Sequence, residues 1–349
     1  MAETQSVWSR LKRALGFRPE ETSPEAGRLR VHPQPYLKPP GFEPEFVNLE
    51  AVDPGVRPVR LTGCRNWHYK LQDLDVAQVA GSTADVIRMR QRRGLGPQKL
   101  IAYMSIGEAE ESRFYWKPEW TRKNGRRVAI APGAPKWLDS QNGEGWLDNF
   151  KVKYWDPDWQ ALIIGPGMFL DRIIAAGFDG VYLDIIDGFE FFETRDRRKT
   201  ARQEMITLVE RISQAARRKR ADFLIVPQNG EELLQSAAYR SAISAIGKED
   251  IFYDQKTGLD INTRCVVEKR PDKMIRDVAD DLNRGLAEQI PVLSVEYLRD
   301  DPRNVAEIPA AEAVIRTHGF IPYFADRKLR ALHPVSMPTA TTTTTVRVS

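Results

Sequence analysis

Residues 178–186 of the chain have the sequence FDGVYLDII. Its short apolar run predicts a strand, in which Val181 and Leu183 alternate with Tyr182 and Asp184. Successive side chains of a strand point to opposite faces of the sheet, and outer helices cover the apolar face. We therefore expect Asp184 to point away from the helices, into the mouth of a barrel.

The chain on both sides of this stretch repeats the pattern of short apolar runs separated by helical segments. The other apolar runs are residues 65–71, 100–106, 223–228, 242–247, 291–298 and 320–324. Strands that alternate with helices predict βαβ units and a parallel sheet. Roughly seven or eight units are present, a number that favours a closed (β/α)8 TIM barrel over an open sheet.

The barrel is expected to occupy residues 61–332, with a different segment at each end. Residues 1–60 combine a basic amphipathic stretch, 7–17, with a proline-rich linker or wrapping arm. The threonine-rich tail, residues 333–349, is low in complexity and is expected to be disordered.

Composition excludes several classes of protein. The net charge of +4, from 52 basic and 48 acidic residues, is too small for the basic stripe of a nucleic-acid-binding domain. Two cysteines and four scattered histidines give no metal-ligand spacing, so neither a metal nor another cofactor is expected. The basic patches RRKTARQ and ARRKR are interpreted as solvated helix faces.

Membrane contact is expected to be weak. No apolar run approaches the roughly 18 residues of a membrane span. Residues 7–17 resemble a helix that touches an anionic membrane surface, although packing of that helix on the domain is favoured. Basic residues stand where a signal peptide would carry its apolar run, which predicts a cytoplasmic location.

Three acidic residues are predicted at the carboxyl ends of three strands. The alternation rule places Asp184, Glu249 and Glu296 on the inward face, with Tyr103 on the same face. Enzymes of the barrel class carry their chemistry at this end. A single acid could be the structural partner of an arginine, but three acids together favour a carboxylate site.

Carboxylates alone suffice for cleavage of a glycosidic bond. One protonates the leaving oxygen, and the other attacks the sugar carbon or activates water. They also bind Mg²⁺ or Ca²⁺, but no run such as DxDxDG is present, so a metal site ranks lower.

Six of the eight tryptophans fall in the insert between residues 116 and 159. They are Trp116, Trp120, Trp137, Trp146, Trp155 and Trp159. Flat aromatic faces with a polar edge are suited to stacking on sugar rings. The alternative, a small core that holds the insert rigid, is favoured for most of them, with one or two lining the cleft.

Several runs resemble glycoside hydrolase family 114, the endo-α-1,4-polygalactosaminidases and their bacterial relatives. They are YMSIGEAEESRFYW (103–116), VKYWDPDW (152–159), GFDGVYLDIIDGFEFF (177–192), PQNGEELL (227–234), WHYKLQDLD (67–75) and IGKEDIFY (246–253). The resemblance covers roughly residues 61–330. It implies hydrolysis of α-1,4 linkages in a polysaccharide that contains galactosamine or N-acetylgalactosamine.

The resemblance also implies roles for individual residues. Asp184 matches the family's fourth-strand aspartate and Glu249 its sixth-strand glutamate, the expected catalytic pair. By analogy with related retaining barrels, Asp184 is the nucleophile and Glu249 the general acid and then the base. The expected substrate-binding residues are Tyr69, Tyr103, Glu108, Arg113, Trp155, Asp187, Asn229, Glu296 and Tyr297. A structural ion pair is the alternative for Glu108 and Arg113.

Two departures from the family leave a second function open. Only 12 residues, 88–99, separate Ile87 from Leu100, so the second βα unit is short, and Arg88 stands about where the family has an acid. Polysaccharide-degrading relatives are commonly exported, whereas no signal peptide is predicted here. The alternative to an active glycosidase is an inactive carbohydrate-binding or regulatory relative.

Overall fold

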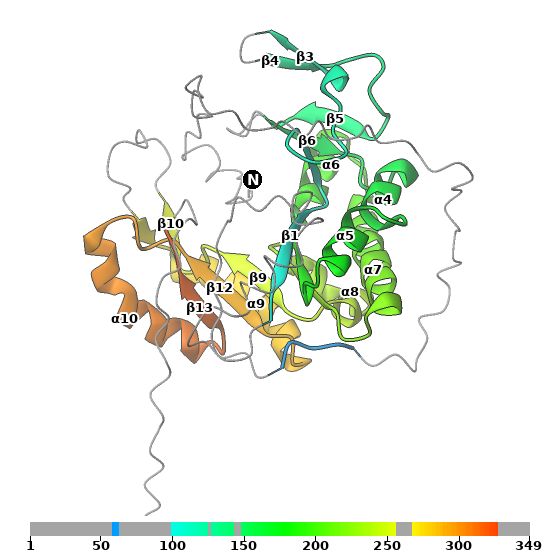
Figure 1. The fold of residues 1–349 in the computed structure, drawn as a ribbon. Helices are drawn as coiled ribbons and strands as arrows, with labels where there is room; N and C mark the ends of the chain where they lie inside the picture. Colours follow the sequence, from blue (N-terminus) through cyan, green and yellow to red (C-terminus); the bar gives the residue numbers. More distant parts are fainter. Residues whose placement is uncertain (1–57, 63–98, 125–126, 143–147, 256–266, 327–349) are drawn as a thin grey trace, which may run out of the picture.

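The computed structural model describes residues 58–62, 99–124, 127–142, 148–255 and 267–326 (Figure 1). The predicted arm, the strand expected at 65–71, most of the short unit at 84–99 and the threonine-rich tail lie outside the described residues. The predicted division of the chain into three segments therefore stays a prediction.

Six parallel strands form the frame of the described residues. They are β1 (Ile101–Ser105), β7 (Gly180–Asp184), β8 (Leu224–Pro227), β9 (Ile246–Glu249), β12 (Val292–Glu296) and β13 (Ile321–Phe324). The order is β1-β7-β8 in one sheet and β9-β12-β13 in the other. A parallel bridge from Gln228 to Gly247 joins the two sheets into one array.

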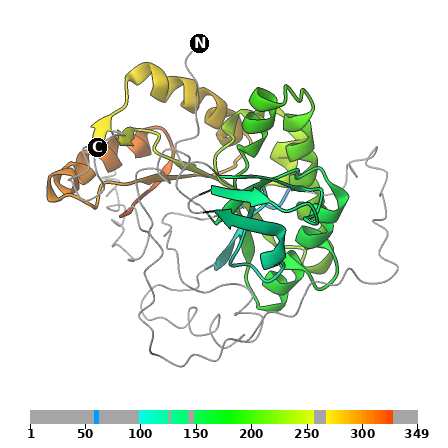
Figure 2. The ribbon, with the colours of Figure 1, turned by 90° about the horizontal axis from the view of Figure 1, so that it is seen from above.

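Helices separate these strands along the chain and lie outside them (Figures 1 and 2). They are α4 (Pro157–Ile164), α5 (Phe169–Ala175), α6 (Gly188–Arg195), α7 (Ala201–Lys219), η2 (Glu231–Gln235), α8 (Ala237–Ala242), α9 (Asp272–Ala287) and α10 (Pro302–Thr317). The predicted α/β alternation is confirmed. Within the described part of the chain the array is open, with β1 and β13 at its edges, so the closed barrel is not shown.

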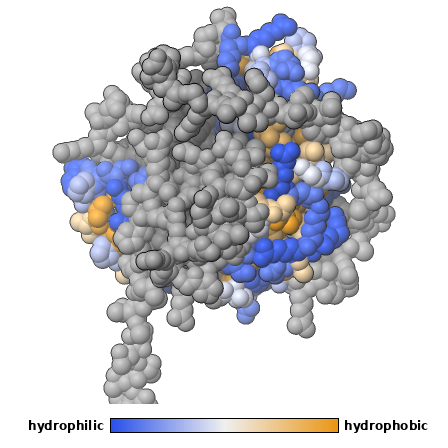
Figure 3. Space-filling view, viewed as in Figure 1, coloured by the Kyte–Doolittle hydropathy of each residue, from blue (hydrophilic) through white to orange (hydrophobic). Residues whose placement is uncertain are grey.

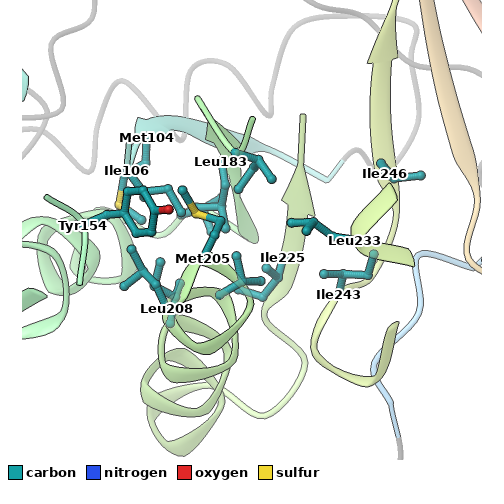
Figure 4. Close-up of a cluster of buried hydrophobic side chains, with 14 of the residues drawn as sticks. Met104, Ile106, Tyr154, Leu183, Met205, Leu208, Ile225, Leu233, Ile243 and Ile246 are labelled. Atoms are coloured by element: carbon teal, nitrogen blue, oxygen red, sulfur yellow. The ribbon is translucent and has the colours of Figure 1, made fainter. Parts of the chain in front are cut away.

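Helix α7 illustrates how the main core forms. Its buried residues recur at helical spacing, and Met205 and Leu208 point toward Leu183 of β7 and Ile225 of β8 (Figure 4). The last turn carries Arg217, Arg218 and Lys219, whose positive charges complement the negative end of the helix dipole. Burial of this apolar stripe against the strands is the main force that holds the helix in place.

An insert between β1 and α4 adds a second layer of small antiparallel sheets. Its elements are β2 (Glu108–Glu110), η1 (Pro118–Trp120), β3 (Thr121–Asn124), β4 (Arg127–Ile130), β5 (Leu138–Gln141) and β6 (Asn149–Val152). The order is β2-β6-β5, with β3 and β4 as a separate pair. A further antiparallel pair, β10 (Tyr253–Gln255) and β11 (Val267–Lys269), follows β9.

Four of the insert's tryptophans form a buried core of their own. Trp116 and Trp120 lie 5.4 Å apart by ring centroid, Trp120 and Trp137 5.3 Å, and Trp137 and Trp159 4.9 Å. All four are buried, so the interpretation of these tryptophans as packing residues is confirmed. Trp146 lies outside the described residues.

The surface of the described residues is mostly hydrophilic in the view of Figure 3. Large hydrophobic side chains that are exposed include Met274 on α9 and Val305 and Val314 on α10. Among the described helices, none has the length and apolar character that a membrane crossing requires.

Candidate active site

Asp184 lies at the carboxyl end of β7 and is buried. The register between β1 and β7 pairs Tyr103 with Tyr182 and Ser105 with Asp184, so these side chains share one face. The hydroxyl of Tyr103 donates a hydrogen bond to Oδ2 of Asp184 at 2.5 Å. Both side chains lie on the face opposite Leu183, which packs toward helix α7 (Figure 4).

The backbone turns sharply directly after Asp184. Ile185 has a φ of 59°, a left-handed conformation that is unusual for a β-branched residue. Gly107 packs against this turn, and a Cβ built on it would lie 2.3 Å from the carbonyl oxygen of Ile185. The glycine of the SIGEAE run is therefore needed for the close approach that fixes the end of β7.

Gly107→Ala is expected to lower the free energy of unfolding by about 1–3 kcal/mol, because the methyl group forces the turn away from β1. Displacement of the turn moves Asp184, so kcat for any reaction at this site falls as well. Thermal unfolding and activity measure the two effects. Gly133→Ala is the control, since a Cβ built on Gly133 meets nothing within 4 Å. Equal stability and activity of the two variants would contradict the role of Gly107.

Glu249 lies at the carboxyl end of β9 and is also buried. The hydroxyl of Tyr297 donates a hydrogen bond to its Oε1. The backbone N–H of Glu249 donates a hydrogen bond to the side-chain oxygen of Asn229 at 3.4 Å. Burial raises the pKa of the Glu249 carboxyl well above its usual value, and the negative charges of Asp250 and Asp184 raise it further.

Tyr182 extends from the strand that carries Asp184 toward the strand that carries Glu249. A Cβ built on Gly247 of β9 would lie 2.1 Å from the hydroxyl oxygen of Tyr182, so this side chain reaches from β7 across to β9. Burial raises the pKa of Tyr182 well above its usual value, and the charges of Glu249 and then Asp184 add to the effect. Asp184 and Glu249 thus act on the same side chain and face the same interior.

Glu296 does not belong to this interior, and its predicted inward direction is wrong. The register between β12 and β9 pairs Val295 with Glu249 and Ser294 with Lys248. Val295 therefore shares the face of Glu249, and Glu296 points to the helix-covered side. The alternation rule fails in β12 because apolar Leu293 and Val295 fill the interior at this strand.

Glu296 instead anchors the loop that follows Glu249. Its carboxylate accepts hydrogen bonds from the backbone N–H groups of Ile251, Phe252 and Tyr253, at 3.1, 3.3 and 3.2 Å. The hydroxyl of Ser294 donates another at 3.1 Å. Burial raises the pKa of Glu296 to about 7, and these hydrogen bonds limit the rise.

Glu108 and Arg113 each have partners in the insert. Glu108 is buried in β2 and accepts hydrogen bonds from the side-chain amides of Asn142 at 2.9 Å and Asn149 at 3.2 Å. Its ion pair with Lys151 spans 2.7 Å. These contacts join β2 to β6 and to the residue that follows β5, so they give Glu108 a role in holding the insert together.

Arg113 is connected to the carboxylate site through an aromatic ring. It forms an ion pair with Glu110 at 2.6 Å. Its guanidinium carbon lies 5.7 Å from the ring centroid of Tyr103, the residue that donates to Asp184. This contact favours an orienting role for Arg113.

The remaining predicted binding residues lie at several places. Trp155 packs against Phe192 at 4.8 Å and under the guanidinium of Arg198 at 4.1 Å. Asp187 is half-buried just before α6. Asn229 follows β8 in a left-handed conformation, with a φ of 61°. Tyr69 lies outside the described residues.

Two interior residues, Tyr182 and Gln228, are not among the site residues that the sequence predicts. Tyr182 shares the predicted face of Asp184. Gln228 follows β8 and bridges to Gly247 on the interior face. The alternation of β8, continued by one residue past Pro227, predicts that Gln228 faces the interior.

Comparison with known proteins gives a family match. Residues 65–342 match the family described as Glycoside-hydrolase family GH114. An uncharacterized protein of Methanocaldococcus jannaschii is 34% identical over 300 residues, which cover 76% of this chain and 78% of the relative. An uncharacterized protein of Deinococcus radiodurans is 35% identical over 235 residues, covering 67% of this chain and 66% of the relative.

A solved structure shows a similar fold. It is the glycoside hydrolase domain of PelA from Pseudomonas aeruginosa, with a TM-score of 0.54 and 17% sequence identity. The match covers 76% of this chain and 94% of that domain. At this identity the likeness concerns the arrangement of strands and helices alone.

Proposed function

The chain belongs to glycoside-hydrolase family GH114, and we propose that it hydrolyses α-1,4-linked galactosamine or N-acetylgalactosamine polysaccharide. The observation that carries the proposal is the buried pair Asp184 and Glu249, which face one interior and each accept a hydrogen bond from a tyrosine hydroxyl. Two carboxylates on either side of a glycosidic bond are sufficient for its hydrolysis. The amino sugar is the finer part of the proposal and follows the resemblance of the SIGEAE and GFDGVYLD runs.

The two carboxylates take different roles in this proposal. Asp184 is the nucleophile, and Tyr103 fixes the orientation of its carboxylate through the bond to Oδ2. Glu249 protonates the leaving oxygen and then removes a proton from the attacking water. Its raised pKa supports this role, because an acid must still hold its proton at the working pH. The anomeric configuration is retained, since each of two displacements inverts it.

The rate is expected to fall as the pH rises through the pKa of Glu249. Burial and neighbouring charge raise that pKa, so the protonated acid persists well above pH 4.5, the ordinary value for this group. We expect the alkaline limb of kcat/KM correspondingly far above that value, measured from about pH 4 to about pH 10. An alkaline limb near pH 4.5 would show that Glu249 is not the acid.

A panel of polymers tests the proposed substrate. The purified chain is incubated with α-linked polymers of galactosamine, N-acetylgalactosamine and galactose, and new reducing ends are measured over time. We expect reducing ends from one or both amino-sugar polymers and a slower reaction with polygalactose. Cleavage of polygalactose alone would contradict the proposed sugar.

The second candidate is a carbohydrate-binding relative without turnover. The short unit at residues 84–99 is the sequence feature that favours it. This candidate predicts saturable binding of galactosamine oligomers with no release of reducing ends. The intact carboxylate pair favours the enzyme.

Closure of the barrel is also part of the proposal. The described array has β1 and β13 at its edges, and the family match begins at residue 65. We expect two more strands, from residues 65–71 and from the short unit at 84–99, to complete a (β/α)8 barrel. An experimental structure of this region tests the expectation, and strands that pair elsewhere would contradict it.

A further inference from the structure

Gln228 lies between the two carboxylate-bearing strands. It directly follows β8, the strand between β7 and β9 in the array. Its backbone N–H donates to the carbonyl oxygen of Leu183 at 2.8 Å, and it bridges to Gly247 on the other side. Its backbone is therefore fixed on both sides.

The strand register determines where the Gln228 side chain points. Val226 pairs with Tyr182, so the residue two positions later is level with Asp184. The bridge to Gly247 places Gln228 on the face of Gly247, which is the face that the Tyr182 hydroxyl contacts. The side chain thus projects into the interior that Asp184 and Glu249 share.

The amide of Gln228 is buried and has no hydrogen-bond partner in the described part of the chain. Its exposed fraction is 0%, and both Oε1 and Nε2 lack a partner there. Gln160, also buried, shows the usual arrangement, because its Nε2 donates to the carbonyl oxygen of Tyr154 and its Oε1 accepts from Arg211. A buried amide without partners lowers stability, so its presence beside the carboxylates calls for a partner that arrives with the substrate.

We propose that Gln228 binds the sugar ring at the reacting centre, donating a hydrogen bond from Nε2 and accepting one at Oε1 from neighbouring hydroxyl or amino substituents. The proposal rests on the proposed function of this site and adds a substrate-binding residue to it. An amide suits vicinal substituents because it presents a donor and an acceptor side by side. A protonated sugar amine donates a hydrogen bond to Oε1, whereas a hydroxyl group can donate to Oε1 or accept from Nε2.

The test is Gln228→Met, which keeps the length of the side chain and removes both polar atoms. We expect kcat/KM on the galactosamine polymer to fall on the order of 100-fold, from two lost hydrogen bonds. The midpoint of thermal unfolding stays the same or rises, since the amide has no partner to lose. A residue with a merely structural role would show the opposite, a lower midpoint. Gln235→Met is the matched control, since Gln235 is exposed and bonds Asp281.

Each other outcome contradicts the proposal in a recognisable way. Unchanged kcat/KM for Gln228→Met, with an active wild type, overturns the role of Gln228 and leaves the proposed function intact. A variant that does not fold also overturns it, because the amide would then have partners within the protein. If the wild type neither cleaves the polymer nor binds galactosamine oligomers, the proposed function fails, and the assignment of Gln228 fails with it. If the wild type binds oligomers without cleaving them, weaker binding by Gln228→Met supports the contact, and equal binding overturns it.

Discussion

Asp184→Asn is expected to lower kcat on the galactosamine polymer by at least about 1000-fold, because the amide is a poor nucleophile and cannot form the covalent intermediate. The variant should fold normally, since asparagine is isosteric and its carbonyl oxygen still accepts the hydrogen bond from Tyr103. Release of reducing ends measures the effect, and thermal unfolding monitors the fold.

The control for this variant is Asp196→Asn, at an exposed aspartate paired with Arg195. We expect its activity to match the wild type, which shows that loss of one negative charge is not the cause. Full activity of Asp184→Asn would remove Asp184 from the mechanism.

Glu249→Gln is expected to lower kcat on the polymer by about 100- to 10,000-fold, the range that general acid catalysis contributes. The loss should be much smaller with an aryl glycoside, whose leaving group departs without protonation. Comparing the two substrates therefore separates the role of an acid from that of a binding residue. Glu210→Gln, at a half-buried glutamate on α7, is the control.

Equal losses on the polymer and on the aryl glycoside would contradict the assignment of Glu249 as the acid. They would instead indicate that the variant disturbs the interior, for example through the hydrogen bond with Tyr297. Thermal unfolding of the variant distinguishes these cases, since a disturbed interior lowers the midpoint.

Alternation along single strands predicted much of the site. It placed Tyr103 and Asp184 on one face, and the structure joins them by a hydrogen bond. The same rule failed for Glu296, because it assumes that the apolar face of a strand meets the helices. In β12 both faces are buried, so hydropathy carries no information about which face is inside.

Contacts that depend on the register of neighbouring strands could not be predicted from the sequence. The approach of Gly107 to Ile185 and of Tyr182 to Gly247 depends on how neighbouring strands are staggered. The tryptophans of the insert were ambiguous for a related reason, since aromatic residues in a polar stretch suit both a sugar-binding surface and a small core. The packing of Trp137 against Trp159 shows that these two tryptophans form a core.

Hydrolysis by Asp184 is tested most directly by the initial rate of reducing-end release from α-1,4-linked galactosamine polymer, measured for the wild type and for Asp184→Asn at equal concentration. We expect steady release by the wild type and release at the level of buffer for the variant. Equal release by the two proteins, or binding of the polymer by the wild type without any release, would contradict this expectation.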